Sequence, residues 1–179
     1  MSLTDEQLMI AVGKGDMAAF EQIVIRYQQY AWRIAYRYTN NRSDAEEIAQ
    51  EAFLKILDSA GSYRSSAKFS TYLYKVLANL CLDHARKKRP RLAADFPVDK
   101  GLTETPYSNL QIQERDLAVK SAVDSLPARQ RLAVILRYYE NLSYSQIADA
   151  MNTSVKAVER LLDRARKQLE SSLGDFFEK

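Results

Sequence analysis

The stretch NLSYSQIADAMNTSVKAVERLLDRARKQL, residues 141–169, has the features of two helices joined by a tight turn. Ser143 and Gln146 have the spacing of a capping box, so a helix is expected to begin at this point. Its expected buried residues are Ile147, Ala148 and Met151. Asn152 follows, and asparagine tolerates the left-handed backbone that a helix-turn-helix requires at its turn. The residues suited to cap the second helix are Thr153 and Ser154.

The second helix of this motif has one apolar side and one charged side. The apolar residues recur at spacings of three and four and are Val155, Val158, Leu162, Ala165 and Leu169, with Leu161 beside them. The outward side carries Lys156, Glu159, Arg160, Asp163, Arg164 and Lys167. Such a helix can enter the major groove of DNA and present side chains to base edges and phosphates. An amphipathic helical hairpin without a DNA partner is the alternative interpretation.

Two carboxylates, Glu159 and Asp163, share the expected outward face with Arg160. Carboxylates repel phosphate groups, so a DNA-binding helix must use them in another way. They can accept a hydrogen bond from cytosine N4, or they can pair with Lys156 and Lys167 and hold these lysines in position. Both roles are consistent with the sequence.

The composition of the whole chain predicts an all-α protein. Glycine and proline total nine of 179 residues, strand-like alternation is rare, and residues of high helix propensity dominate. No apolar run reaches the roughly 18 residues that cross a bilayer, and the N-terminus MSLTDEQLM is polar and acidic. We therefore expect a cytoplasmic protein without membrane insertion. A single cysteine, Cys81, and a single histidine, His84, cannot form an internal disulfide or a His/Cys metal cage. Carboxylate-only sites remain possible, but no calcium-loop spacing occurs, and no metal or cofactor is expected.

A polar, proline-rich stretch divides the chain into two parts. Residues 90–113 contain three of the four prolines and several turn-forming residues, without a sustained helical period. The sequence thus predicts two small helical domains, residues 1–92 and 114–179, joined by a flexible linker at residues 93–113. Because this linker is polar, we expect the domains to move relative to each other unless a partner clamps them.

Charge in the N-terminal domain is separated into two adjacent blocks. Residues 40–60 carry two basic and five acidic side chains, a net charge of −3, whereas residues 63–92 carry eight basic side chains and one acidic side chain, a net charge of +7. A solvated surface explains either block alone. The adjacency of opposite blocks favours two different partners.

The acidic block is expected to form an amphipathic helix that begins with a second capping box, at Ser43 and Glu46. Its expected core residues are Ile48, Ala49, Ala52, Phe53, Ile56 and Leu57. The opposite face carries Asp44, Glu47, Gln50, Glu51 and Asp58. A row of acceptors on one face suits a partner helix rich in arginine, and a solvated surface explains it equally well.

In the basic block, one stripe at helical spacing combines aromatic, cationic and amide side chains. Its members are Tyr72, Lys75, Asn79, Asp83 and Arg86. Single-stranded DNA needs a ring for base stacking, hydrogen bonds for base edges and positive charge for phosphates, and this stripe offers all three. Tyr63 and Phe69, in an expected loop before the helix, add stacking surface in this interpretation, whereas burial in the core is the alternative for each aromatic residue. His84 is expected at the core boundary rather than in a catalytic role.

Three blocks of the chain together resemble one known family. The blocks are GDMAAFEQIVIRYQQYAWRIAYRYTNNRSDAEEIAQEAFLKIL (residues 15–57), YRSSAKFSTYLYKVLANLCLDHARKKR (residues 63–89) and LPARQRLAVILRYYENLSYSQIADAMNTSVKAVERLLDRARKQL (residues 126–169). In this order and spacing they resemble the conserved regions of extracytoplasmic-function (ECF, group IV) sigma factors of bacterial RNA polymerase, within the sigma-70 family. The resemblance covers nearly the whole chain outside the linker.

The resemblance implies a sigma region 2-like domain, a sigma region 4-like domain and promoter-specific transcription initiation. Core polymerase would be bound, at its β′ coiled coil, by Asp44, Glu47, Gln50 and Glu51. The −10 element would be recognised and melted by Tyr63, Phe69, Tyr72, Lys75, Asn79 and Arg86. The −35 element would be read by Ser154, Lys156, Glu159, Arg160, Asp163 and Arg164. The further implied partners are the polymerase β flap and an anti-sigma factor, and because the polymerase performs the catalysis, the chain itself is not expected to be an enzyme.

Two other classes of protein are alternatives. A stand-alone dimeric helix-turn-helix regulator would bind operator DNA directly, with half-sites about one helical turn apart. In such a regulator, the acidic and aromatic-basic faces of the N-terminal domain would have no obvious task. An α-helical enzyme fits less well, because no nucleophile–base pair, phosphate-binding loop or metal cluster is recognisable in the sequence.

Overall fold

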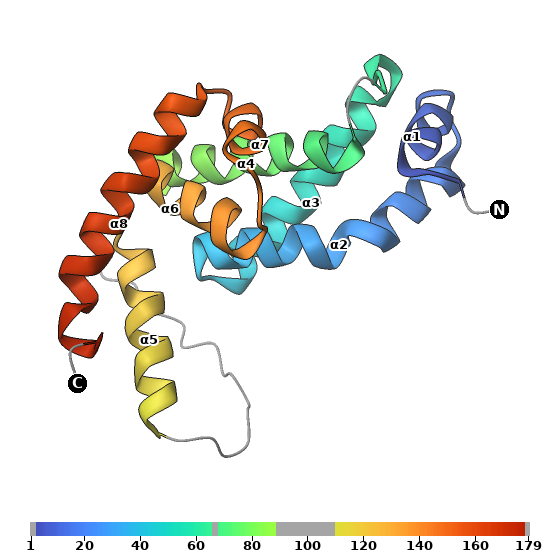
Figure 1. Ribbon diagram of the computed structural model, residues 1–179. Coiled ribbons are helices and arrows are strands. Elements are labelled where there is room, and N and C mark those ends of the chain that lie inside the picture. Colours follow the sequence, from blue (N-terminus) through green and yellow to red (C-terminus); the bar gives the residue numbers. More distant parts are fainter. Residues whose placement is uncertain (1–2, 66–67, 89–109, 178–179) are drawn as a thin grey trace.

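The computed structural model describes residues 3–65, 68–88 and 110–177, and every regular element within these ranges is a helix, as the sequence predicts (Figure 1). The helices of the N-terminal unit are α1 (Asp5–Gly13), α2 (Met17–Thr39), α3 (Arg42–Ser59), the 3-10 turn η1 (Ala60–Ser62) and α4 (Phe69–Lys88). Those of the C-terminal unit are α5 (Leu110–Asp124), α6 (Ala128–Val134), the π turn η3 (Ile135–Tyr139), α7 (Tyr144–Ala150) and α8 (Val155–Phe177).

The predicted linker, residues 93–113, lies mostly outside the described residues. Its last part does not match the expectation, because α5 already begins at Leu110. Among the described side chains that follow, Ala122, Val123 and Leu126 are buried. Over residues 110–113 the sequence LQIQ alternates apolar and polar residues, which is not the spacing from which a helix is recognised.

A short connection joins α2 to α3. The Asn40 backbone is left-handed (φ 50°), and its N–H donates to the Tyr36 carbonyl at 2.8 Å, which ends α2. The Asn41 side chain then accepts a hydrogen bond from the Asp44 N–H at 2.9 Å and caps α3. The predicted start at Ser43 is therefore wrong, because Asn41 supplies the cap and Ser43 already lies within α3.

The core of the N-terminal unit lies where α2, α3 and α4 pack together. Its buried side chains from α3 and α4 include Ile48, Ala52, Phe53, Ile56, Leu73, Leu77 and Cys81. Each large apolar side chain buried in this way stabilises the fold by about 1.5–3 kcal/mol. The apolar stripe predicted for α3 is confirmed except at Leu57, which is partly exposed, and His84 lies at the core boundary as expected.

The helix-turn-helix is confirmed at α7 and α8. Ser143 and Gln146 cap each other reciprocally, with N–O distances of 3.2 and 2.8 Å, and Asn152 is left-handed (φ 48°). Ser154 rather than Thr153 caps α8, because its Oγ accepts from the Ala157 N–H at 3.2 Å. The prediction that Val155 is buried is wrong. As the first residue of α8 it is 42% exposed, and the buried stripe begins one turn later with Val158, Leu162 and Ala165.

The C-terminal helices pack directly on the N-terminal unit. α6 and α7 both contact α4, and the π turn contacts α2, while α1 and α8 lie on opposite sides of the molecule (Figure 1). One continuous cluster of buried apolar side chains runs through both units. The two units are therefore packed together in this structure, through apolar side chains of helices that are far apart in the sequence.

Candidate polymerase and promoter interfaces

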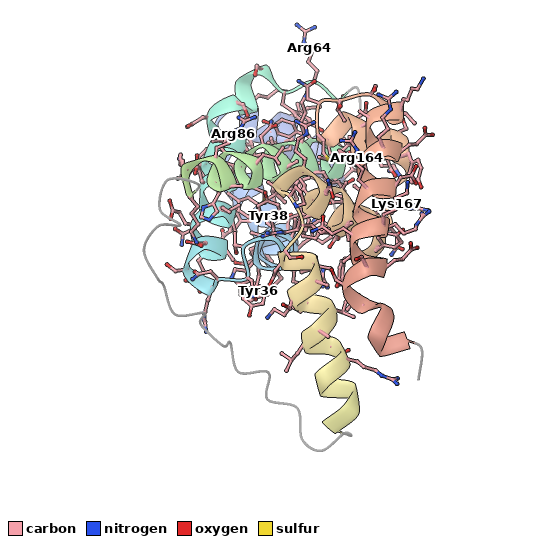
Figure 2. All side chains as sticks on the ribbon, turned by 90° about the vertical axis from the view of Figure 1, so that its left-hand side faces the viewer. Tyr36, Tyr38, Arg64, Arg86, Arg164 and Lys167 are labelled. Atoms are coloured by element: carbon pink, nitrogen blue, oxygen red, sulfur yellow. The ribbon has the colours of Figure 1, made fainter. Side chains whose placement is uncertain are left out.

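The outward face of α8 carries the residues predicted to contact the −35 element. Lys156, Glu159, Arg160, Asp163 and Arg164 are all exposed, and Ser154 is exposed at the start of the helix. Figure 2 shows Arg164 and Lys167 extending from α8. The structure brings this predicted set together on one helix.

One of the two carboxylates on this face, Asp163, lies beside a cation of the same helix. Asp163 Oδ1 lies 3.8 Å from Arg166 Nη1, one turn further along α8, so its ion-pair partner is not the expected Lys167. This pair is exposed and contributes little to stability. Neither Arg160 nor Arg164 takes part in this ion pair.

The predicted −10 surface lies on α4 and the loop before it. Tyr63 and Tyr72 are half-buried neighbours, with ring centroids 5.7 Å apart, and the Tyr72 hydroxyl bonds to Ser59 Oγ. Lys75 and Asn79 are exposed further along the helix. An aromatic platform followed by a cation and an amide is therefore present, as the stripe predicted.

Arg86 and Arg64 extend the positive charge of this surface at its two ends. Arg86 is exposed but bonds to Asp83 at 3.0 Å, so part of its charge is neutralised. Arg64 is exposed and projects from the loop before α4 (Figure 2). The sequence interpretation counted Arg64 as part of the basic block but did not name it as a site residue. Its position directly after Tyr63 in the sequence could have identified it as part of the −10 surface.

Phe69 is not available for base stacking, which corrects the prediction. Its side chain is completely buried as the first residue of α4, and its ring meets the Tyr27 ring edge-on at a centroid distance of 5.0 Å. The Phe69 N–H donates to Glu6 Oε1 at 3.0 Å, which anchors the start of α4 to α1. The sequence placed Phe69 in an exposed loop because the covering helices, α1 and α2, are distant in sequence.

The predicted acidic face of α3 is only partly assembled. Glu47 and Gln50 are exposed, and Glu51 is 41% exposed and lies 3.5 Å from Lys55. Asp44 instead turns toward α4, where it bonds to Lys88. The four residues therefore do not form one free surface, because Asp44 is already neutralised within the protein.

Leu54 is a residue of this face that the sequence interpretation missed. It is 60% exposed on α3, although most large apolar side chains of this helix are buried. Its position is one turn beyond Gln50 and Glu51, so the helical spacing placed it on the outward side. Leu54 therefore adds one exposed apolar side chain to this acceptor-rich face.

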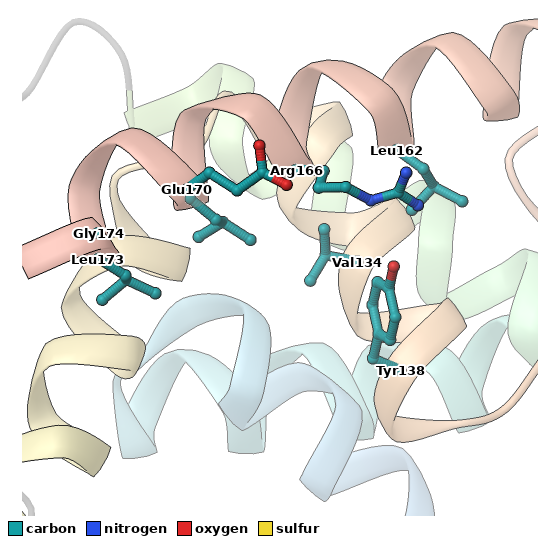
Figure 3. Close-up of a pocket in the computed structure, with 8 residues that line it drawn as sticks. Val134, Tyr138, Leu162, Arg166, Glu170, Leu173 and Gly174 are labelled. Atoms are coloured by element: carbon teal, nitrogen blue, oxygen red, sulfur yellow. The ribbon is translucent and has the colours of Figure 1, made fainter. Parts of the chain in front are cut away.

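An apolar groove lies between α8 and the helix formed by α6 and the π turn (Figure 3). It has a volume of about 380 Å³ and is lined mainly by Val134, Tyr138, Leu162, Leu169 and Leu173. Arg166 and Glu170 lie on α8 at this groove, and Tyr138 is 57% exposed. The sequence interpretation did not predict this groove, because its residues come from two separate segments.

Within the described part of the chain, no group of three or more potential metal-ligating side chains occurs. No described helix is both long enough and apolar enough to cross a membrane.

Sequence comparisons agree with the geometry of both units. The profile "Sigma-70 region 2" matches residues 23–91, and the profile "Sigma-70, region 4" matches residues 116–169. Fold and surfaces therefore define a protein of the sigma-70 class, in which one unit carries region 2 and the other carries region 4.

Full-length relatives specify the family further. The RNA polymerase sigma-H factor of Pseudomonas aeruginosa is 32% identical over 94% of this chain and 93% of its own length. The ECF RNA polymerase sigma factor SigW of Bacillus subtilis is 32% identical over 92% and 94%, and the ECF RNA polymerase sigma-E factor of Escherichia coli is 31% identical over 96% and 95%. The chain belongs to the ECF family of RNA polymerase sigma factors.

Two solved structures share the fold at low sequence identity. CnrH, in complex with the cytosolic domain of CnrY, gives a TM-score of 0.67 at 21% identity and covers 96% of this chain and 97% of its own. The sigma factor RpoE of Bartonella quintana, in complex with the anti-sigma factor NepR, gives a TM-score of 0.69 at 22% identity, with coverages of 87% and 96%. These similarities support the helical architecture of both units.

Proposed function

We propose that this sigma factor binds core RNA polymerase in the cytoplasm and directs initiation through separate surfaces for the enzyme and for each promoter element. The observation that carries the proposal is the combination, in one chain, of an acceptor-rich outward face on α3, an aromatic and cationic stripe on α4 and a basic face on the second helix of a helix-turn-helix. A stand-alone regulator would use only the last of these surfaces.

The surface proposed for the β′ coiled coil consists of Glu47, Gln50, Glu51 and Leu54 on α3. Carboxylate and amide oxygens suit arginine-rich partner helices, and the exposed Leu54 supplies an apolar contact among them. Asp44 is left out of this surface because it is bonded to Lys88. The apolar groove at Val134, Leu162 and Leu173 is proposed to receive the β flap, since an open apolar groove suits an apolar helix face.

The surface proposed for the −10 element consists of Tyr63, Tyr72, Lys75 and Asn79, with Arg64 beside it. Tyr72 is proposed to stack on an unpaired base, while Lys75 and Arg64 neutralise nearby phosphates. Lys156, Arg160 and Arg164 on α8 are proposed to contact the −35 element in the major groove. Each contact alone can be weak, because binding through two tethered sites multiplies the affinity.

An anti-sigma factor is proposed as a further partner. The proposal is supported by RpoE of Bartonella quintana, which has the same fold and was solved in complex with the anti-sigma factor NepR. Such a partner would prevent initiation until it is removed. Addition of the partner to the transcription assay described next should therefore abolish the promoter-specific products.

Run-off transcription tests the central proposal. Core RNA polymerase is combined with or without this protein on a pooled library of promoter fragments, and the products are sequenced. New transcripts whose start sites share −10 and −35 sequences are expected only when the protein is present. If the protein instead binds the fragments alone as a dimer and yields no transcripts, the dimeric-regulator alternative replaces the proposal.

A further inference from the structure

The first turn of α4 is held by a carboxylate that comes from α1. The Phe69 N–H, at the start of α4, donates a hydrogen bond to Glu6 Oε1 at 3.0 Å, although the two residues are 63 positions apart in the sequence. The first N–H groups of a helix have no partner within the helix, and a side-chain oxygen close in sequence normally satisfies one of them. The bond from Phe69 lowers the pKa of Glu6, and the charged carboxylate interacts favourably with the helix dipole. Glu6 is therefore a cap that α1 supplies to α4.

The start of α1 holds Glu6 in place for this contact. Thr4 and Gln7 form a capping box around it, with N–O distances of 2.9 and 3.3 Å. Asp5, directly before Glu6, accepts hydrogen bonds from two side chains of α2. The donors are the Arg26 guanidinium, at 2.7 Å, and the Tyr27 hydroxyl, at 2.5 Å. The position of the Glu6 backbone is thus fixed relative to α2 before its side chain reaches α4.

The aromatic rings proposed to contact the −10 element depend on this first turn. The Tyr72 N–H bonds to the Lys68 carbonyl at 3.4 Å, so Tyr72 lies in the first turn of α4, three residues after Phe69 and on the same side. The Phe69 and Tyr72 rings meet edge-on with their centroids 6.4 Å apart. The Tyr72 ring in turn lies 5.7 Å from the ring of Tyr63. A shift of the Phe69 backbone would therefore change the arrangement of both tyrosines.

Loss of this cap is expected to loosen the first turn without unfolding α4. The later turns of α4 are anchored by Leu73, Leu77 and Cys81, which are buried in the core. Loss of a helix cap changes the equilibrium between the formed and the frayed helix end by about 2- to 30-fold. A frayed turn has to be ordered again when DNA binds, and this ordering reduces the affinity for an unpaired base.

We propose that Glu6 is a positioning residue for promoter opening: by capping α4 from α1, it arranges Tyr63 and Tyr72 for an unpaired base before DNA binds. Glu6 acts through α4 and needs no contact with DNA. The inference rests on the proposed role of Tyr72 at the −10 element, whereas the cap itself does not depend on that role. Recognition of the −10 element then depends on α1 as well as on the stripe of α4.

Three substitutions at Glu6 separate the reach of the side chain from its charge. Glu6→Gln keeps an oxygen at the same distance and removes the charge, Glu6→Asp keeps the charge and withdraws it by one methylene group, and Glu6→Ala removes both. Hydrogen exchange of the Phe69 amide is measured by NMR on the full chain. It should be about fivefold faster in Glu6→Ala and Glu6→Asp, and it should stay within about twofold of the unmodified chain in Glu6→Gln.

The same variants, assembled with core RNA polymerase, are compared for promoter opening by the permanganate reactivity of unpaired thymines. Glu6→Ala and Glu6→Asp should reduce opening about fivefold, with polymerase binding unchanged, whereas Glu6→Gln should remain within about twofold of the unmodified protein. In a chain that already carries Tyr72→Ala, the further change Glu6→Ala should reduce opening by less than about twofold. The two losses are not additive because the cap acts through the ring.

The matched control is Asp16→Ala, which removes a cap of the same kind from α2. Asp16 Oδ1 accepts hydrogen bonds from the Ala18 and Ala19 N–H groups at 3.0 and 3.1 Å. This variant should lower the melting temperature by an amount similar to that of Glu6→Ala and leave promoter opening unchanged. Equal losses of opening in both variants would show a general effect of stability and overturn the positioning role.

Four further results would each overturn the proposal. They are normal opening by Glu6→Ala, unchanged exchange of the Phe69 amide in that variant, equal losses in Glu6→Gln and Glu6→Ala, and additive losses with Tyr72→Ala. If Glu6→Ala does not fold, Glu6→Asp serves in the same comparisons. If Tyr72→Ala alone opens promoters normally, the proposed −10 role is rejected and the positioning role with it, whereas faster exchange of the Phe69 amide still establishes the cap.

Discussion

At the scale of single residues, charged groups at the edge of the N-terminal core are paired across helices. Asp44 on α3 bonds to Lys88 on α4, and its Oδ2 lies 3.3 Å from His84 Nε2. Burial lowers the pKa of His84, while Asp44 partly opposes this effect. The neutral form of the histidine is therefore favoured in the folded protein.

The first prediction is that stability decreases in mild acid because of His84. The pKa of His84 is lower in the folded chain than the ordinary value of about 6.5. The unfolded chain therefore binds a proton more readily, so the contribution of His84 to the free energy of unfolding is complete above that pH and is lost as the pH falls. The melting temperature should fall between pH 7.5 and 5.5, and it should fall less in His84→Gln. The chain has one histidine, so the difference between the two proteins isolates this group. Equal decreases in both would contradict the prediction.

The second prediction concerns the ring of Tyr72. Tyr72→Ala should reduce promoter opening by about 5- to 100-fold, because stacking on an aromatic ring contributes about 1–3 kcal/mol per base. Tyr72→Phe is the matched variant, since it keeps the ring and loses only the hydroxyl contact with Ser59. Permanganate reactivity of unpaired thymines measures opening, and polymerase binding is measured separately. Normal opening with Tyr72→Ala would rule out the stacking role.

At the scale of elements, α1 packs closely against two other elements of the N-terminal unit. α1 covers the start of α4 through the Glu6–Phe69 contact, and it also approaches η1 closely. At Gly13, a Cβ atom would lie 2.6 Å from the Ala60 carbonyl oxygen. Glycine is therefore required there because of the neighbouring backbone, not because of its own conformation.

The third prediction follows from this contact. Gly13→Ala should lower the free energy of unfolding by about 1–3 kcal/mol, because the added methyl group forces α1 away from η1. Gly61→Ala is the control, since nothing lies within 4 Å of its Cβ position. Urea unfolding of both variants provides the measurement. If Gly61→Ala proved as destabilising as Gly13→Ala, the loss of stability would come from replacing a glycine in a helical segment and not from the contact between α1 and η1.

The fourth prediction concerns the outward face of α8. Lys156→Ala and Arg160→Ala should each reduce transcription from −35-dependent promoters by about tenfold, because each removes about 1–3 kcal/mol of DNA contact energy. Lys14→Ala, which removes an exposed cation after α1, is the control for charge alone. Promoters without a −35 element should respond weakly to all three changes. If transcription from both promoter classes decreased equally, the decrease would not result from loss of the −35 contact.

At the scale of the whole molecule, the two units share one buried apolar cluster. Leu82 and Ala85 on α4 lie near Ala128 and Leu161 of the C-terminal unit, around a hollow of about 290 Å³. A shared core joins the stability of one unit to that of the other. The chain should therefore unfold as one cooperative structure, although its sequence divides into two domains.

The fifth prediction is that the free chain unfolds in a single calorimetric transition. Arg37→Glu should separate this into two transitions, because loss of the ion pair between Arg37 and Glu140 weakens the interface between the two units. Differential scanning calorimetry on the full chain is the measurement, with Arg42→Glu, which breaks an exposed ion pair with Glu46 on α3, as the control. Two transitions in the unmodified protein would contradict cooperative docking.

The sequence by itself determined the all-α class, the helix-turn-helix and the family. Capping residues such as Ser143 and the left-handed Asn152 act within one turn of chain, and apolar spacing reveals which side of a helix is buried. The same local patterns correctly grouped Lys156, Arg160 and Arg164 on one exposed face. The start of α3 was predicted wrongly at Ser43, because Asn41 can also cap a helix and is the residue that does so.

Only the tertiary structure decided which of the candidate surfaces remain available. Phe69 is buried by Tyr27, Asp44 is neutralised by Lys88, and Arg37 meets Glu140 more than a hundred residues away. These contacts depend on how the helices pack in space, which no local pattern of spacing or capping encodes. The packing of the two units has the same physical origin, because apolar faces of helices far apart in the sequence bury each other when α6 and α7 meet α4.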